Sequence, residues 1–192
     1  MVNARILFTL CAFAFGFAGA ASSERCDRAS FGAFQQKDYK DTRARVLEAQ
    51  ADGPLTFRLA KSGKHIVVSG TWHDPYSGKW LVNVPASTVE IDHVVPVCWA
   101  WSHGADMWDR ETRRAFYNDT RFLIAVEQYW NAHKGSMAPD RFMPINGAFA
   151  CEYVTLFLEG VATYDLRLSA TEVADFAMTF DAACGWKVPA IN

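Results

Sequence analysis

The sequence predicts an α+β fold in which a small sheet comes first and packed helices follow at the C-terminal end. Short runs rich in β-branched and aromatic residues, separated by Gly, Pro, Asn, Asp and Ser, occupy the first part of the chain. Longer apolar stretches with helical capping signals fill the last part. No internal repeat or long linker interrupts this order, so we expect one domain with a substantial core.

The first residues are typical of a secretory signal peptide, which we assign to residues 1–21. Arg5 supplies the basic start, residues 6–18 are almost wholly apolar, and small residues follow at 18–20. An uncleaved anchor is the alternative, but the run is shorter than the roughly 20 residues that a spanning helix needs. We therefore predict that residues 22–192 form a secreted or periplasmic monomer that has no membrane association after cleavage.

The charge of the mature chain limits its possible partners. Removing residues 1–21 takes away Arg5 and no acid, which leaves 18 Lys and Arg against 21 Asp and Glu, a net charge of −3. A protein that binds many phosphates by charge alone has a strong basic surplus. Any contact with nucleic acid is therefore expected to be local and assisted by a metal.

Four cysteines remain after cleavage, and an even number in an exported chain predicts two disulfides. Three pairings are possible. Cys151 and Cys184 both fall in the helical C-terminal part, which favours this pair and leaves Cys26 with Cys98. A zinc site is the weaker alternative, because no two of these cysteines are spaced as a metal clip.

The first part of the domain is expected to contain one short helix and several strands. Residues 41–51 combine good helix formers with Val46 and Leu47, and Gly53-Pro54 ends that helix. The expected strands are residues 56–59, 65–69, 80–84 and 89–95. Pro96 ends the last of these strands.

A strand, a connection, a second strand and a helix are predicted next. The connection after residues 89–95 includes helical segments at 99–103 and 110–117. A short apolar strand at 121–126 leads directly into a helix at 127–133. This order would bring Asp92 and His93, on the first strand, close to Asn131 on the helix.

The C-terminal part is plainly helical. Residues 148–161 are nearly all apolar or aromatic, and Ser169 with Glu172 forms a capping-box pattern that opens a helix through about Ala183, before Gly185. We expect both helices to pack against the sheet, and we see no chemistry in them.

Asp92-His93 lies on an apolar strand that ends at Pro96, and the segment that begins at Asn131 follows 35 residues after Pro96; together they supply the groups needed to hydrolyse a phosphodiester. Hydrolysis needs an activated water and a cation on the phosphate. Taken alone, Asp92-His93 is more often a surface pair or a structural histidine. The combination of DHVVP with a later NxxKG instead favours a functional pair.

This joint pattern resembles the HNH, or His-Me finger, nuclease motif. More closely, the chain resembles small secreted bacterial HNH proteins related to the C-terminal domain of GmrSD-type restriction enzymes. The similarity runs over roughly residues 26–160 and is carried by the order and spacing of short segments. These segments include residues 28–32, 41–47, 74–79, 91–96, 101–105, 113–119, 123–126, 131–135 and 140–144.

The resemblance implies a ββα-metal core and assigns a role to each site residue. His93 would be the general base, because a neutral imidazole can take a proton from water near pH 7. Asp92 and Asn131 would bind one divalent cation, most plausibly Mg²⁺, which prefers oxygen ligands. Lys134 would hold the phosphate, although a solvated helix end explains this lysine equally well.

The arginines 113 and 114 are further phosphate-binding candidates, for which a solvated surface is the favoured interpretation. One departure concerns the middle Asn that many HNH motifs carry before the Leu of the second strand, because Phe122 stands there. Asn118 lies nearby and could replace it by bonding backbone groups.

The remaining conspicuous residues favour structural interpretations. His103 and His133 have no partner at metal-ligand spacing, so we expect exposed or capping roles. The tryptophans at 99, 101, 108 and 130 could stack on bases, but core packing is favoured.

Together these features predict an exported, metal-dependent endonuclease that cleaves DNA, or RNA, without strong sequence specificity. The alternative is an exported nucleic-acid-binding or structural module that keeps the HNH frame without turnover. A weaker third alternative is another metal-dependent phosphoesterase that uses the same Asp-His pair.

Overall fold

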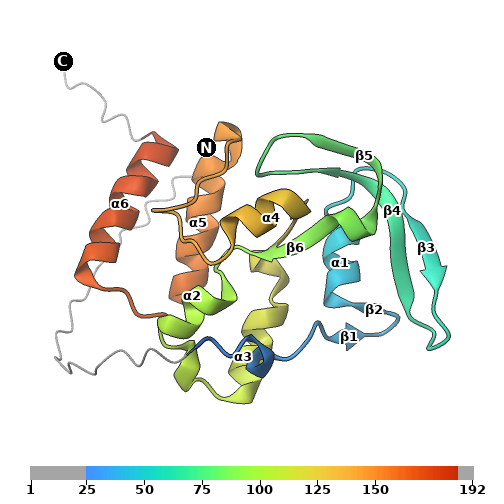
Figure 1. The fold of residues 1–192 in the computed structure, drawn as a ribbon, viewed down its shortest axis with the longest axis horizontal. Coiled ribbons are helices and arrows are strands. Elements are labelled where there is room, and N and C mark those ends of the chain that lie inside the picture. The colour runs from blue at the N-terminus through green and yellow to red at the C-terminus, as the bar shows by residue number, and fades with distance from the viewer. Residues whose placement is uncertain (1–24, 186–192) are drawn as a thin grey trace, which may run out of the picture.

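The computed structural model describes residues 25–185, and the expected signal peptide at residues 1–21 lies outside them. The fold is α+β, as predicted, with small antiparallel sheets and C-terminal helices (Figure 1). No helix within the described part of the chain has the length and apolar character needed to cross a membrane. The elements are η1 Arg28–Phe31, β1 Gln36–Lys37, β2 Lys40–Asp41, α1 Thr42–Ala49, β3 Thr56–Leu59, β4 His65–His73, β5 Trp80–Pro85, η2 Ala86–Thr88, β6 Val89–His93, α2 Val97–Ser102, η3 Ala105–Met107, α3 Arg110–Asn118, η4 Thr120–Phe122, β7 Leu123–Glu127, α4 Gln128–Lys134, α5 Gly147–Thr163 and α6 Ala170–Cys184.

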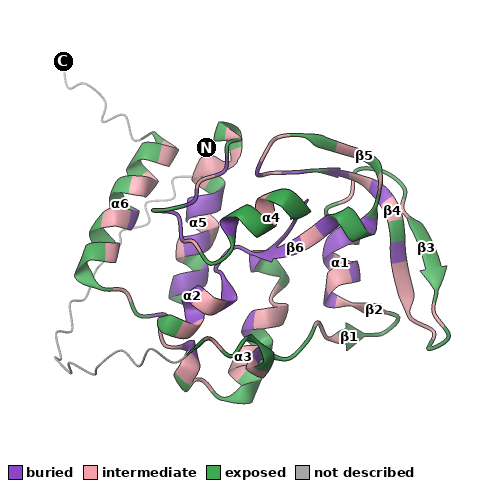
Figure 2. Cartoon of the chain, viewed as in Figure 1, coloured by how far each residue is buried: buried purple, intermediate pink, exposed green. Residues whose placement is uncertain are grey.

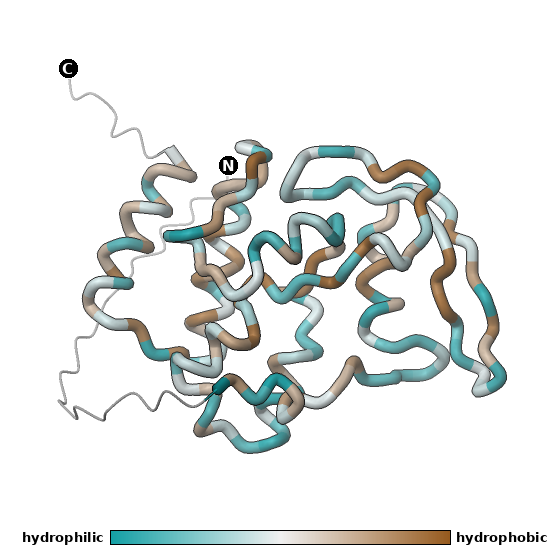
Figure 3. Tube along the Cα trace, in the orientation of Figure 1, coloured by the Kyte–Doolittle hydropathy of each residue, from teal (hydrophilic) through white to brown (hydrophobic). Residues whose placement is uncertain are grey.

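Three antiparallel sheets are present in the described residues, and each is small. β1 pairs with β2, β3–β4–β5 form a meander, and β6 pairs with β7. The hairpin of β1 and β2 is hydrophilic along its length (Figure 3). Asp41 begins α1 by accepting a hydrogen bond from the Ala44 backbone amide, as its place at the N-cap requires.

The β6–β7 ribbon lies between two apolar cores because its side chains alternate between its faces. On β7, Leu123 and Ala125 join the core formed with α1 and β4, whereas Ile124 and Val126 join the core formed with the helices. Figure 2 shows buried residues along β6 and on the inner sides of α1, α2 and α5. Burial on both faces explains why β7 is apolar from Leu123 to Val126.

The C-terminal helices form as predicted, but only one of them packs on a sheet. α5 contacts the ends of the β6–β7 ribbon, since a Cβ added at Gly160 would lie 2.7 Å from Val95 Cγ2 and 3.5 Å from Phe122 Cδ1. α6 instead packs on the outer side of α5, and its Phe176 ring lies 5.2 Å from the Phe157 ring (Figure 1). The expectation that both helices pack on the sheet is therefore wrong for α6, because α5 already covers that face.

Both predicted disulfides form: Cys26 with Cys98 and Cys151 with Cys184. The second joins α5 to α6. The first ties the N-terminal segment to α2, across 72 residues of chain.

Candidate active site

The candidate site lies where β6, β7 and α4 meet. β6 and β7 pair in register from Val89 with Glu127 to His93 with Leu123, and α4 begins at the residue after β7. α4 crosses over β6 (Figure 1). Strand, strand and helix therefore follow each other as expected, with Asp92 and His93 at the end of β6 and Asn131 on α4.

Two pairs of polar side chains connect α4 to β6. Glu90 and Asp92 are two residues apart and share one face of the strand, while Asn131 and Lys134 are three apart and share one face of the helix. Asn131 Nδ2 donates to Glu90 Oε2 at 2.5 Å, and Lys134 Nζ lies 2.9 Å from Asp92 Oδ2. The crossing of the helix over the strand thus sets Asn131 against Glu90 and Lys134 against Asp92.

The Asp92 carboxylate is 5 % exposed and is held from two directions. Besides Lys134, the buried Tyr76 hydroxyl donates to Asp92 Oδ2 at 2.5 Å. Tyr76 comes from the loop between β4 and β5, where Asp74 accepts hydrogen bonds from the backbone amides of Tyr76 and Ser77. This loop was expected as a turn, and nothing in its sequence alone showed that it supports Asp92.

Lys134 is completely buried, so the alternative of a solvated helix end is wrong. Its ammonium also donates to the His93 carbonyl at 2.9 Å. Burial lowers the pKa of Lys134, and the Asp92 carboxylate partly offsets that effect. The ammonium is directed at the strand that carries the site, and Lys134 does not line the adjoining pocket.

His93 lies on the opposite face of β6 from Asp92, and its ring is enclosed by aromatic side chains. The Tyr117 ring lies 4.5 Å away, and the Phe34 and Phe116 rings are stacked near it at 6.1 Å. Nε2 lies 3.0 Å from the Tyr117 carbonyl oxygen, which can only accept, so Nε2 carries the proton and donates it to this bond. Nδ1 is then the proton-accepting nitrogen.

Burial lowers the pKa of His93 from 6.5 to about 3. The hydrogen bond to Tyr117 opposes this shift, while the positive charges of Arg28 and Lys134 add to it. The imidazole is consequently neutral at pH 7, which is the state a proton acceptor requires.

Asn118 lies outside the pocket and holds the segment next to it. Its Oδ1 accepts from the Gln35 backbone amide at 2.7 Å and from the Thr42 hydroxyl at 2.6 Å. Its Nδ2 donates to the carbonyls of Ala33 and Arg114. These bonds fix the end of α3 directly beside Tyr117, whose carbonyl accepts from His93. Phe122, at the place of the usual middle Asn, is buried; its backbone carbonyl accepts from the Val94 amide, and its own amide donates to the Asp119 carbonyl.

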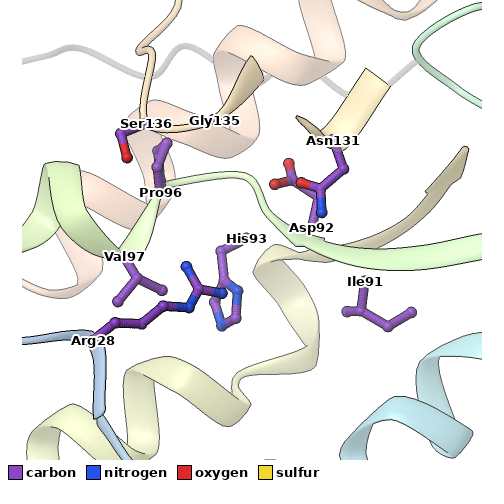
Figure 4. Close-up of a pocket in the computed structure, with 9 residues that line it drawn as sticks. All are labelled: Arg28, Ile91, Asp92, His93, Pro96, Val97, Asn131, Gly135 and Ser136. Atoms are coloured by element: carbon purple, nitrogen blue, oxygen red, sulfur yellow. The ribbon is translucent and has the colours of Figure 1, made fainter. Parts of the chain in front are cut away.

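A pocket of about 290 Å³ opens over this arrangement (Figure 4). Asp92, His93 and Asn131 all line it, so the structure brings the three predicted residues to one cavity. The other lining residues are Arg28, Ile91, Pro96, Val97, Gly135 and Ser136.

The oxygen donors at the pocket fit a hard divalent cation. Asn131 directs its Nδ2 to Glu90, which leaves the amide oxygen available, and the Asp92 carboxylate faces the same cavity. Residues 25–185 contain no group of three or more His, Cys, Asp and Glu side chains placed to hold a metal. A site with so few protein ligands is unsuited to structural zinc. It fits Mg²⁺, which retains waters and binds through one or two carboxylates together with substrate phosphate.

The other candidates have structural contacts. Arg113 donates to the carbonyls of Ala105 and Asp106, and Arg114 is exposed outside the pocket. His103 caps α2 and bonds Glu172 Oε1 at 2.7 Å, while His133 is exposed on α4. The tryptophans at 99, 101, 108 and 130 pack in or against the helical core, as predicted.

Sequence reasoning missed Glu90, Tyr76 and Arg28. Glu90 stands two residues before Asp92, so strand periodicity could have placed it on the same face. Tyr76 and Arg28 fall in two segments that carry the family resemblance, 74–79 and 28–32, but strand periodicity does not place either of them near Asp92.

Comparison with known proteins supports a nuclease relationship. The model of the family "GmrSD restriction endonucleases, C-terminal domain" matches residues 33–172. A protein of the fungus Arthroderma benhamiae described as an uncharacterized secreted protein is 36% identical over 113 residues, which cover 57% of this chain and 54% of the relative. The chain thus spans about half the length of that relative. No solved structure matches the chain.

Proposed function

Because the chain belongs to the family of GmrSD restriction endonuclease C-terminal domains, we propose that it is an exported, metal-dependent endonuclease of the HNH type. The substrate is DNA or RNA, and the bond cleaved is the phosphodiester. The observation that carries the proposal is the shared pocket of Asp92, His93 and Asn131, on the strand–strand–helix unit formed by β6, β7 and α4. We take that unit to be a ββα-metal core.

His93 acts as the general base in this proposal. The Nε2–H group donates a hydrogen bond to the Tyr117 carbonyl, so Nδ1 is the nitrogen that accepts the proton of the attacking water. Burial keeps the imidazole unprotonated at pH 7, so Nδ1 has a free lone pair, and the same burial makes it a weaker base than an exposed histidine. Asn118 acts on His93 indirectly, by fixing the end of α3 on which the Tyr117 carbonyl lies.

Asp92 and Asn131 hold the cation, for which Mg²⁺ is the best candidate. A divalent cation bound there supplies positive charge to the scissile phosphate and its leaving oxygen. Tyr76 and Lys134 orient Asp92 through their hydrogen bonds. Lys134 was expected to hold the phosphate directly, but its burial and its contacts favour this positioning role.

The distribution of charge favours one path for the nucleic acid. Residues 25–85, which include the β3–β4–β5 sheet, carry ten Lys and Arg against six Asp and Glu. Residues 86–185 carry seven against fourteen. A polyanion is therefore drawn toward the N-terminal half, from which Arg28 lines the pocket. The mature chain as a whole is acidic, which favours cleavage without strong sequence specificity.

Export is supported by the signal-like residues 1–21, the two disulfides and the secreted fungal relative. Disulfides persist in oxidising compartments outside the cytosol. Action as a monomer and a bacterial source both remain predictions, and the matched relative is fungal.

A plasmid-nicking assay with Mg²⁺, Mn²⁺ or chelator tests the proposal. Native protein with intact disulfides is compared with His93→Ala, Asn131→Ala and the control His133→Ala, which removes an exposed histidine from α4. We expect metal-dependent nicking that falls at least a hundredfold in the two site variants, the size of effect typical for loss of a general base. The control should match the native protein.

Two outcomes would count against the mechanism. Nicking that survives His93→Ala unchanged excludes His93 as the base. Binding of DNA by the native chain with no cleavage under any metal favours a binding module that keeps the HNH frame, an alternative raised by Phe122 at the usual Asn position.

A further inference from the structure

The N-terminal segment of the described chain, residues 25–32, brings a positive charge to the pocket. Cys26 joins it to α2 through the disulfide with Cys98. Asp27 caps the short η1 helix, and Phe31 is completely buried, 5.9 Å from the Phe116 ring. A covalent bond and a buried aromatic side chain therefore hold the segment at both ends, and Arg28 lies between them.

Arg28 lines the same pocket as Asp92, His93 and Asn131 (Figure 4). Its guanidinium lies 5.8 Å from the centre of the Tyr117 ring, the residue whose carbonyl accepts from His93. The side chain is exposed, and within residues 25–185 it makes no hydrogen bond and no ion pair.

Most other arginines near the site already have partners. Arg43 donates to the carbonyls of Ala86 and Val89, and Arg113 donates to two carbonyls of η3. The buried ammonium of Lys134 is engaged by Asp92. Among the cationic side chains of the described residues, Arg28 alone combines a place in the pocket lining with donors that no protein group occupies.

We propose that Arg28 binds the non-bridging oxygens of the substrate phosphate, and that the disulfide-tethered segment 25–32 is a working part of the site. The inference rests on the proposed nuclease function and adds the residue that holds the phosphodiester. A guanidinium presents two parallel N–H donors that match two phosphate oxygens. Arg28 lies outside residues 33–172, the part of the chain that the family model matches.

The disulfide has a positioning role under this proposal. It fixes the segment two residues before Arg28 and keeps the guanidinium over the pocket. Without the disulfide, segment 25–32 must lose its conformational freedom when the substrate binds. The double variant Cys26→Ser, Cys98→Ser should therefore bind substrate more weakly than the native protein, with a smaller loss of affinity than Arg28→Ala.

Two measurements test the role of Arg28. The first is the affinity for a short fluorescein-labelled DNA duplex in chelator, followed by anisotropy over a range of salt concentrations. The second is kcat and KM for cleavage with Mg²⁺. The proteins are native, Arg28→Ala, Arg28→Lys and the control Arg110→Ala, which removes an exposed arginine at the start of α3, outside the pocket lining.

We expect Arg28→Ala to weaken duplex binding about tenfold to a hundredfold, the range for loss of a hydrogen-bonded charge. The slope of log affinity against log salt should fall by about one, because one phosphate contact is lost. Arg28→Lys should keep the slope and recover part of the affinity, since it keeps the charge but not the fork of donors. Arg110→Ala should match the native protein.

The outcomes separate this inference from the nuclease function. If the native chain cleaves DNA and Arg28→Ala leaves affinity, slope and kcat/KM unchanged, Arg28 does not bind the phosphate and the nuclease function stands. If the native chain binds without cleaving and Arg28→Ala weakens that binding with the smaller slope, the inference stands and turnover is excluded. A native chain that neither binds nor cleaves overturns both.

Discussion

Replacing Lys134 by Met tests whether the buried ammonium holds Asp92 in place. The two charges lie 2.9 Å apart with side chains 0% and 6% exposed. At an effective dielectric constant of about 20, their gross attraction is about 6 kcal/mol, much of which is offset by the hydration both groups lose. Lys134→Met leaves the buried carboxylate with the Tyr76 hydroxyl as its side-chain partner. We expect the free energy of unfolding to fall by about 3–5 kcal/mol, the usual cost of stranding one member of a buried pair.

Urea unfolding with intact disulfides and chelator present measures this effect. The proteins are native, Lys134→Met, Asp92→Asn, the double variant, and the control Lys79→Met, which removes an exposed lysine. The double variant should lose less stability than the sum of the two single changes, by about 2 kcal/mol, because no charge is left alone. If one of the single variants fails to fold, the double variant should still fold, because it leaves no unpaired buried charge. A loss below about 1 kcal/mol in Lys134→Met, or strictly additive losses, would refute the reasoning.

Three further predictions concern stability. Replacing Cys151 and Cys184 together by Ala should lower the free energy of unfolding by about 4 kcal/mol, as chain entropy predicts for a bond spanning 33 residues; chemical denaturation measures it. Gly160→Ala should cost about 1–3 kcal/mol, because the new Cβ would lie 2.7 Å from Val95 Cγ2; thermal unfolding shows it as a lower Tm. The pKa of Asp119 lies below 3.8, since hydrogen bonds from Arg121 and Tyr164 outweigh the raising effect of burial. Its contribution to stability is therefore fully present above its ordinary pKa and is lost as the pH falls below that value, so unfolding of Asp119→Asn should depend less on pH there.

Each stability prediction has its own check. Gly147→Ala, where nothing lies within 4 Å of the new Cβ, should be neutral or slightly stabilising, and a loss equal to that of Gly160→Ala would argue against steric overlap. A double Cys variant as stable as the native protein would show that the disulfide between α5 and α6 does not stabilise the fold. If the free energy of unfolding of Asp119→Asn falls at low pH as steeply as that of the native protein, other carboxylates dominate acid unfolding.

The sequence predicted most elements because their signals are local. Ser169 and Glu172 form the expected capping box at α6, and Gly185 ends that helix in a left-handed conformation. The strands at 56–59 and 80–85 agree with the predicted runs to within one residue. β4 is longer than predicted, to His73, because its pairing with β5 continues past Gly70, a residue that by itself disfavours a strand.

The candidate site was predictable only in part. Asp92, His93 and Asn131 reach one pocket as the order of strand, strand and helix indicated. Their hydrogen-bond partners were not predictable, because Tyr76 and Tyr117 approach from loops and helices that the local pattern does not orient.

The sequence by itself determined which chemical groups are present and on which kind of element each lies, since residue identity and local propensity are properties of the chain. Only the tertiary structure decided what each group faces. The crossing of α4 over β6 placed Lys134 against Asp92 and Asn131 against Glu90. From the sequence alone, Lys134 could equally have lain at a solvated helix end, but in the fold it is the buried counter-ion of Asp92. The disulfide between Cys26 and Cys98 was predicted from the sequence, but only the tertiary structure decided that this bond, across 72 residues, brings the segment of Arg28 to the pocket, because that contact depends on long-range packing.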